Sequence, residues 1–368
     1  MMVQARLNDR LPLLTETSLI HQTSGMGHAY PIREIARQAG LSEATVDRVL
    51  HNRPGVRAST ASNVRQAITD LDRQRSQLRL TGRTFLVDVV MQTPDRFSSA
   101  VKSALEAELP SLRPAVVRAR FDFREKGRPA DIVRVLDDIR HRGSMGVVLK
   151  APDVPEVTDA IAQLDNSGIP VVTLVTDIPL SRRIAYVGID NRAAGSTAAY
   201  LIDRLLGDGD GDVLMALSRS VFRGEEEREI GFRATMRSRS AERALIEETD
   251  TDGLDASVLE STLRTLQRHP DINAVYSIGG GNKAILEAFD AADRRCQVFV
   301  GHDLDRDNLQ LLHEERLTAV LHHDLRHDMR LACHIIMKAQ GAIDGPIESV
   351  RSPIHVVTPH NIPALPTA

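Results

Sequence analysis

The sequence predicts an α/β fold made of two doubly wound parallel-sheet lobes, preceded by a small all-α domain. From residue 84 onward, short β-branched runs alternate with helical patterns, as in parallel sheets with helical crossovers. The stretch from 84 to 368 is longer than one hydrophobic core usually spans, so we expect two lobes. Before it, three short helical patterns separated by tight turns predict the all-α domain.

The composition excludes several classes of protein. With 42% apolar and 26% charged residues, the chain is not disordered as a whole. The two cysteines cannot form a disulfide framework, and no apolar run approaches the ~20 residues of a membrane span. Because residues 1–29 lack a signal-peptide pattern, we expect a cytoplasmic protein with no membrane partner. We also expect no cofactor.

The N-terminal elements follow in order. Residues 1–29 show no period, so we expect a mobile tail or a start codon assigned too early. The first helix is predicted to begin after Pro31 and to stop at Gly40, which suits a left-handed end. Ser42 is a candidate N-cap for the second helix, and a third helix is predicted from Ser59.

These three helices, within a domain predicted at 30–72, have the layout of a helix-turn-helix reader of DNA. Residues 30–83 carry a net charge of +5, whereas residues 84–368 carry −9, which favours nucleic-acid binding by this end over a small helical adaptor. On the second helix we expect Glu43, Ala44, Asp47 and Arg48 to face the base edges. The residues better placed for phosphates are Ser42, Thr45, Arg53 and Arg57.

The run from Ile32 to Leu50, followed by Asn52, Pro54, Gly55 and Val56, resembles the DNA-binding headpiece of the LacI/GalR family of bacterial regulators. In that family the position of Asp47 is usually a serine. We therefore expect the carboxylate either to alter operator preference or to be neutralised by Arg48 or Arg53.

Residues 73–83 are polar and basic and are predicted to form a hinge or linker. The family resemblance implies that this stretch folds on DNA into a hinge helix that inserts a leucine into the minor groove. Leu78 or Leu80 could be that wedge, although the usual Tyr-x-Pro-Asn entry is absent.

The remainder, 84–368, is predicted to be a two-lobed domain for effector binding and dimerisation. The expected strands are 85–91, 115–121, 146–149, 170–175, 184–188, 211–216, 244–248, 274–278, 297–301 and 319–322. The run from Val187 to Gly195 resembles the point at which the chain crosses between lobes in type I periplasmic sugar-binding proteins and in LacI/GalR effector domains.

Ligands of open α/β sheets bind beyond the carboxyl ends of the strands, and two lobes would direct these ends into one cleft. The candidates selected for effector binding are Phe97, Lys150, Thr176, Asp177, Phe222, Arg228, Gly280, Gly281, Lys283, His302, Asp303 and His323. The resemblance implies that Arg228 grips the ligand and that Asp303 binds sugar hydroxyls. Phe97 and Phe222 could cover the apolar side of a sugar, or could instead pack in the core.

Two further patterns leave alternatives open. Gly279, Gly280 and Gly281, followed by Lys283, could hold a carboxylate or phosphate at a helix N-terminus, or could be a plain turn. His323 and His327, four residues apart and near Asp324, could bind a metal, but the sequence supplies no third ligand and we expect a solvated helix start.

The function predicted is that of a DNA-binding repressor whose operator affinity is controlled by a sugar, polyol or sugar acid. Because one headpiece buries too little surface to be specific, we expect a homodimer on a palindromic double-stranded operator. The alternatives are a transport-binding protein or a cytoplasmic sugar-binding or sugar-modifying protein, such as a kinase or metal-dependent hydrolase. No nucleophile elbow, His-Glu-x-x-His or phosphate-loop motif supports an enzyme.

Overall fold

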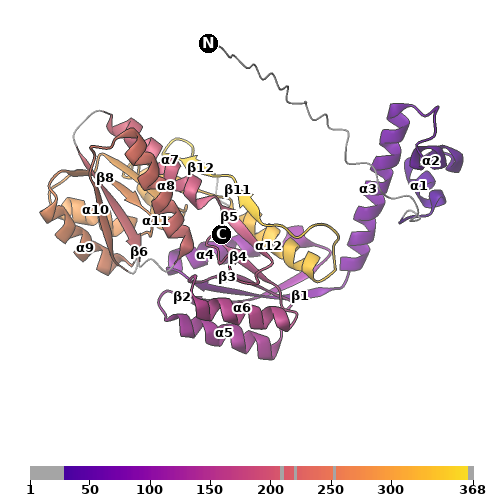
Figure 1. Cartoon of the computed structure of the whole chain (residues 1–368), viewed down its shortest axis with the longest axis horizontal. Helices are drawn as coiled ribbons and strands as arrows, with labels where there is room; N and C mark the ends of the chain where they lie inside the picture. Colours follow the sequence, from indigo (N-terminus) through magenta and orange to yellow (C-terminus); the bar gives the residue numbers. More distant parts are fainter. Residues whose placement is uncertain (1–28, 208–210, 219–221, 252–253, 364–368) are drawn as a thin grey trace, which may run out of the picture. The chain divides into compact units, whose positions relative to one another are not determined.

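The structure is a computed structural model that describes residues 29–207, 211–218, 222–251 and 254–363 (Figure 1). The chain divides into two compact units, with the boundary between Arg75 and Ser76. The predicted tail lies outside the described residues, apart from its last position. Among the described helices, none combines the length and apolar character needed to span a membrane.

The first unit holds the three predicted helices, α1 (Ile32–Ala39), α2 (Glu43–Leu50) and most of α3 (Ala58–Leu80). Gly40 ends α1 in the left-handed conformation, with φ of 65°, as its position in the sequence predicted. A small core of Tyr30, Ile35, Val46, Val64 and Leu71, with Ala36 and Ala67, holds the helices together. The apolar stripes read from the sequence therefore pack as predicted.

Most of the segment predicted as a hinge or linker is helical, and the boundary between the two units falls within it. Residues 73–80 are the last turns of α3, and only 81–83 lie between this helix and the first strand. The segment 58–80 contains no glycine or proline, and it is rich in Gln, Arg and Leu, which favour helix continuation. Leu80 is buried in the core of the second unit, whereas Leu78 is 77% exposed, so only Leu78 remains available as a wedge.

The first lobe of the second unit is a parallel sheet with helices on both faces. Its strand order is β11-β5-β4-β3-β1-β2, in which the order reverses beside β1. Alternate residues of β1 point to opposite faces: Val87 and Val89 contact α4 and α12, whereas Val90 contacts α5 and α6. The elements are β1 (Thr84–Gln92), α4 (Asp95–Glu108), a short 3-10 helix (Leu109–Leu112), β2 (Val116–Arg124), α5 (Pro129–Arg142), β3 (Gly146–Lys150), α6 (Pro155–Asn166), β4 (Val171–Leu174), β5 (Ala185–Ile189), α12 (Leu325–Ala339) and β11 (Val350–Ser352).

The second lobe repeats this plan with the order β12-β10-β9-β8-β6-β7, and only the pairing of β10 with β12 is antiparallel. Helices α9, α10 and α11 cover one face and α7 and α8 cover the other. Its elements are α7 (Asn191–Leu206), β6 (Asp212–Ser218), α8 (Arg223–Arg239), β7 (Leu245–Thr251), α9 (Asp255–Arg268), β8 (Ile272–Ser277), α10 (Asn282–Ala291), β9 (Val298–His302), α11 (Arg306–His313), β10 (Ala319–His322) and β12 (His355–Val357).

Three segments of the described chain join the lobes. They run from β5 to α7, from β10 to α12 and from β11 to β12. All ten strands expected from the sequence are present, within a few residues at each end, and the first crossing falls where the run from Val187 to Gly195 predicted it. The prediction missed β11 and β12, because strands of three residues are too short to show a period.

Candidate functional site

A cavity of about 400 Å³ lies between the two lobes of the second unit. Its wall includes Gln92 and Lys150, at the ends of β1 and β3, and Ser218 and Gly279, beyond β6 and β8. In each sheet these strand pairs flank the point at which the strand order reverses. The cavity therefore lies where doubly wound sheets bind ligands.

Lys150 and Arg228 face this cavity, close enough to the Glu225 and Asp303 carboxylates to interact with their charge but without a direct ion pair among the described residues. Lys150 Nζ lies 3.3 Å from the carbonyl oxygen of Gln92 and 4.3 Å from the centre of the Phe222 ring. The Arg228 guanidinium, on α8, is 5% exposed and donates from Nε to Asn191 Oδ1 at 2.8 Å. Within the described residues, neither cation has an Asp or Glu oxygen within 4.0 Å.

Arg228 is positioned by an unusually close approach of α7 and α8. A Cβ atom on Gly195 would lie 1.9 Å from the backbone oxygen of Arg228, and one on Gly231 would lie 2.1 Å from that of Arg192. Only glycine allows two backbones to approach this closely. These two glycines therefore set the place from which Arg228 enters the cavity.

Glu225 also faces the cavity, and the sequence analysis did not select it. Both of its oxygens accept from the Ser218 hydroxyl at 2.7 Å, and one also accepts from the Ser218 backbone N–H at 3.1 Å. Burial raises the pKa of Glu225. Burial also lowers the pKa of Lys150 to about 8, against the opposing charges of Glu225 and Asp303.

Arg96, on α4 of the first lobe, reaches across to the second lobe. It forms ion pairs with Asp305 at 3.3 Å and with Asp255 at 3.9 Å. Its Nη2 atom lies 2.5 Å from the point that a Cβ atom on Gly280 would occupy. The glycine run therefore accommodates a protein cation of the other lobe.

Asp303 and His302 lie at the end of β9. Asp303 has a left-handed backbone with φ of 64°, a conformation that costs energy for a residue other than glycine. His302 Nε2 lies 2.8 Å from the Tyr276 hydroxyl. Burial, with the charges of Arg228 and His323, holds the pKa of His302 well below its ordinary value. If Tyr276 donates to Nε2, the proton of this neutral ring lies on Nδ1.

Three buried polar atoms on the cavity wall have no hydrogen-bond partner among the described residues. They are Gln92 Oε1, Asn282 Oδ1 and His302 Nδ1. Buried polar atoms are nearly always paired, so these atoms are suited to contact a polar ligand.

Nine of the twelve residues selected from the sequence line the cavity. They are Phe97, Lys150, Thr176, Phe222, Arg228, Gly280, Lys283, His302 and Asp303. Both readings of Phe97 apply, because it lines the cavity and also packs in the core of the first lobe. The residues that sequence reasoning missed include Arg96, Glu225, Asn282 and Asp305, which lie in or beside the first turns of helices.

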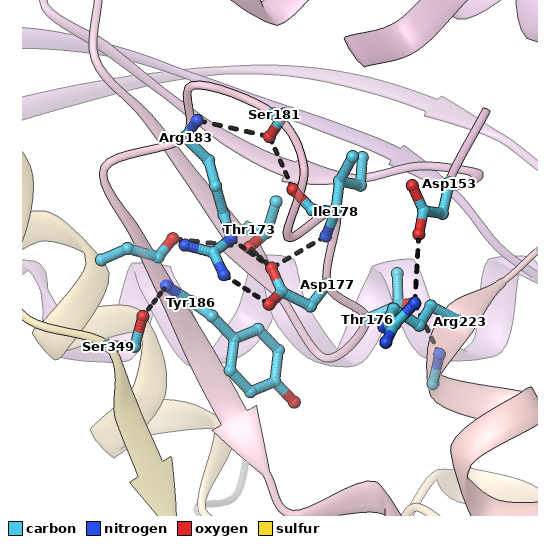
Figure 2. A network of polar contacts seen from close by, with 12 residues as sticks. Asp153, Thr173, Thr176, Asp177, Ile178, Ser181, Arg183, Tyr186, Arg223 and Ser349 are labelled. Atoms are coloured by element: carbon cyan, nitrogen blue, oxygen red, sulfur yellow. Dashed lines mark hydrogen bonds and ion pairs between the residues drawn. The ribbon is translucent and has the colours of Figure 1, made fainter. Parts of the chain in front are cut away.

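The other three selected residues do not line the cavity, which corrects their expected position; they are Asp177, Gly281 and His323. Figure 2 shows the Asp177 carboxylate held by the Arg183 guanidinium, together with the Thr173 hydroxyl and the backbone of Ile178. Gly281 packs against Val258 of α9 with φ of 78°. His323 is fully buried behind Asp303.

The lobes also touch beside the cavity. Figure 2 shows Arg223 of α8 paired with Asp153, which follows β3, at 3.8 Å. The backbone N–H of Gly224 donates to the Thr176 hydroxyl at 3.0 Å. Thr176 therefore both lines the cavity and anchors the start of α8.

The histidine cluster near α12 has structural partners. Asp324 caps this helix by accepting from the backbone N–H groups of Arg326 and His327. The His327 ring contacts Arg330, and His323 contacts Asp328. Among the described residues, no group of three candidate ligands could hold a metal ion.

In the first unit, Glu43, Ala44, Arg48, Arg53 and Arg57 are exposed. Ser42 caps α2 by accepting from the backbone N–H of Thr45 at 3.2 Å, and the two hydroxyls lie 2.8 Å apart. Asp47 pairs with Arg53 at 3.2 Å and with His51 at 3.0 Å. Of the two arginines expected to neutralise Asp47, the structure uses Arg53.

Comparison with known families matches residues 88–342 to the periplasmic binding protein domain, which covers more than half of the chain. The chain belongs to this family. Residues 31–75 match the bacterial regulatory proteins of the lacI family. Together the two matches give the architecture of LacI/GalR regulators, and the chain is a DNA-binding regulator of this type with an effector domain of the periplasmic binding protein family.

Solved structures show the same fold at low sequence identity. A glucose-galactose binding protein, GanP from Geobacillus stearothermophilus, is 19% identical with a TM-score of 0.68, and the match covers 76% of this chain and 99% of that one. A candidate LacI transcriptional regulator from Bacteroides fragilis is 17% identical with a TM-score of 0.66, over 76% and 98%. A solute-binding protein from Burkholderia graminis in complex with D-arabinose is 18% identical with a TM-score of 0.68, over 78% and 98%. No curated protein matches the chain.

Proposed function

We propose that this LacI/GalR-type regulator is a repressor that binds a palindromic operator as a homodimer and responds to a sugar acid in the cavity between its lobes. The observation that carries the choice of effector is the pair of cavity cations, Lys150 and Arg228, which have no carboxylate within 4.0 Å in the described chain.

The two cations favour an anionic group on the effector. A charge held away from water is costly unless an opposite charge or several hydrogen bonds compensate it. Arg228 has two acceptors, Asn191 Oδ1 and, at 3.4 Å, the backbone oxygen of Ile278. Lys150 has one backbone oxygen and an aromatic face. A carboxylate of the effector, placed between Lys150 and Arg228, would supply an opposite charge and hydrogen-bond acceptors to both.

The carboxylates of the cavity favour hydroxyl groups on the same molecule. Asp303 and Glu225 can each accept hydrogen bonds from a polyol, and the Phe222 ring offers an apolar face for C–H groups. The volume of about 400 Å³ suits a small molecule of this size. We assign Lys283, which is exposed at the rim, an additional long-range attraction for the acid.

The proposal differs from the first expectation for the glycine run. Because Arg96 lies against Gly280 and Gly281 faces Val258, we place the acid at Lys150 and Arg228. The headpiece residues keep their proposed roles, with Arg48 on a base edge, Arg57 on phosphate and Leu78 as the candidate wedge.

A matched ligand panel tests the effector class. D-gluconate, D-glucitol and D-glucose differ in acid and carbonyl groups but share a polyhydroxylated chain, and calorimetry gives each dissociation constant. We expect the acid to bind most tightly. Lys150→Met should raise the dissociation constant for the acid by one to two decades, which corresponds to the ~1.5–3 kcal/mol of a charged hydrogen bond. The same variant should change the dissociation constant for the polyol less than threefold.

Lys102→Met is the control, because Lys102 is an exposed lysine of the same lobe that contacts Phe121 outside the cavity. Equal or tighter binding of D-glucitol or D-glucose, or an unchanged dissociation constant for the acid in Lys150→Met, would contradict the proposed effector class.

A further inference from the structure

A line of polar side chains, half-buried at the cavity and fully enclosed beyond it, runs from the cavity to the segments that join the lobes. It starts at Asp303 on the cavity wall and continues through His323 and Asp328 to Ser352. His323 belongs to the crossing from β10 to α12, and Ser352 begins the crossing from β11 to β12. The line therefore reaches two of the three described crossings.

Asp328 ties these two crossings together. It lies in the first turn of α12, which packs on the first lobe, and it is fully buried. One of its oxygens lies 2.5 Å from His323 Nδ1, and the other accepts a hydrogen bond from the Ser352 hydroxyl. One carboxylate therefore connects His323, on the first of these crossings, to Ser352 on the second.

The other ring nitrogen of His323 faces the cavity side. His323 Nε2 is buried, has no hydrogen-bond partner among the described residues, and lies 3.7 Å from Asp303 Oδ1. This distance is longer than a hydrogen bond, and a movement of less than about 1 Å would close it. An unpaired buried nitrogen costs stability, so a second arrangement in which it is paired would be favourable.

The charges around His323 favour its protonated form. Burial opposes the charge, but the hydrogen bond to Asp328 and the charges of Asp328 and Asp303 outweigh it, so the pKa of His323 is raised. Arg228 opposes protonation of His323, and the rings of His302 and His322 also interact with it. The imidazolium can thus lie between two carboxylates, one at the effector and one at the hinge.

We propose that His323 is a positioning residue that couples the effector-facing carboxylate of Asp303 to the hinge between the two lobes. This coupling rests on the proposed effector site. Effector hydroxyl groups that bind Asp303 would hold its carboxylate in one position, in which the distance between Asp303 and His323 Nε2 shortens to a hydrogen bond. Because His323 also contacts Asp328, the resulting shift would reach α12 and β11. In the absence of effector, the attraction between the His323 ring and Asp303 across the open gap of 3.7 Å would still bias the angle between the lobes.

A ligand-free experiment tests this coupling without depending on the identity of the effector. Spin labels at Glu156→Cys on α6 and Glu287→Cys on α10, both exposed, report the distance between the lobes by double electron–electron resonance. His323→Asn can keep the donor to Asp328 but lacks Nε2, whereas His323→Gln can keep the donor towards Asp303. We expect each variant to broaden or shift the distance distribution, because each removes one of the two contacts that the coupling needs.

The control is His313→Asn, since His313 is an exposed histidine of α11 whose ring contacts only its own helix. A wild-type distribution in both His323 variants would overturn the proposal.

Nitrogen-15 spectra of the histidine rings, with His323 assigned by its loss in His323→Asn, give a second readout that a purely structural residue would not share. We expect the pKa of His323 to lie above that of a free imidazole, and Asp303→Asn to lower it. A pKa at or below the ordinary value, or one unaffected by Asp303→Asn, would also overturn the proposal. If these results hold while the ligand panel fails, the effector class is wrong and the coupling stands.

Discussion

We expect Lys150 to make effector binding sensitive to pH. Burial lowers the pKa of Lys150 to about 8, so the ammonium is charged below this pH and loses its proton above it. We expect the dissociation constant for D-gluconate to be nearly flat from pH 7 to 7.5 and to rise towards tenfold per pH unit above 8. Calorimetry from pH 7 to 10 measures this. Lys150→Met should remove this rise of the dissociation constant above pH 8. A rise of the same size in that variant would assign the titration to another group.

Arg48 carries the prediction for DNA recognition. It is exposed on α2, so Arg48→Ala should cost ~1–3 kcal/mol on the operator and relax the preference at one base position. Arg57→Ala is the matched change at a position expected to contact phosphate, and it should lower the affinity for all DNA sequences by the same factor. Binding of a library of single-base operator variants separates the two outcomes. An unchanged base preference in Arg48→Ala would show that α2 is not the recognition helix.

The strand-end rule was sufficient to place single residues such as Lys150 and Asp303 on the cavity wall, while their role in binding stays a prediction. The rule failed at Asp177, because Arg183, six residues later, folds back and pairs with the carboxylate. Glu225 was missed for the opposite reason. It reaches the cavity from the first turn of α8, and no pattern in a charged helix start distinguishes an inward glutamate from an exposed one.

At the scale of elements, the packing of α7 on α8 can be tested. Gly195→Ala would place a Cβ atom 1.9 Å from the Arg228 backbone oxygen, so the helices must separate. We expect a loss of stability of ~1–3 kcal/mol and weaker binding of the acid. Gly127→Ala is the control, since its Cβ atom would meet Asp131 at an ordinary 3.7 Å. Denaturant unfolding measures both variants, and equal stabilities would contradict the argument.

The order of elements was largely predictable because apolar and β-branched residues repeat with a clear period in ten strands and in the headpiece helices. The extent of α3 was not predictable from polarity alone. Residues 73–80 have the composition of a linker but contain no helix breaker, and the burial of Leu80 in the second unit anchors the end of the helix. Short β11 and β12 depend on pairing with β5 and β10, which are distant in the sequence.

For the whole molecule, the fold follows from two sheets whose reversal points face one cavity, which the alternation of strands and helices was sufficient to predict. The contacts that decide the chemistry of the site were not predictable, because they join distant residues. Arg96 meets Asp305 of the other lobe, and His323 meets Asp328 and, through it, Ser352. Such pairs leave no periodic signal in one sequence.

We propose that a sugar acid bound between the lobes controls the binding of specific DNA. The most direct test is to select duplexes from a random library with the full chain, and then to measure affinity for the selected site with and without saturating D-gluconate. We predict a palindromic site whose dissociation constant changes at least tenfold with the acid and less than twofold with D-glucitol. Failure to enrich any sequence, or an affinity that the acid leaves unchanged, would contradict the account.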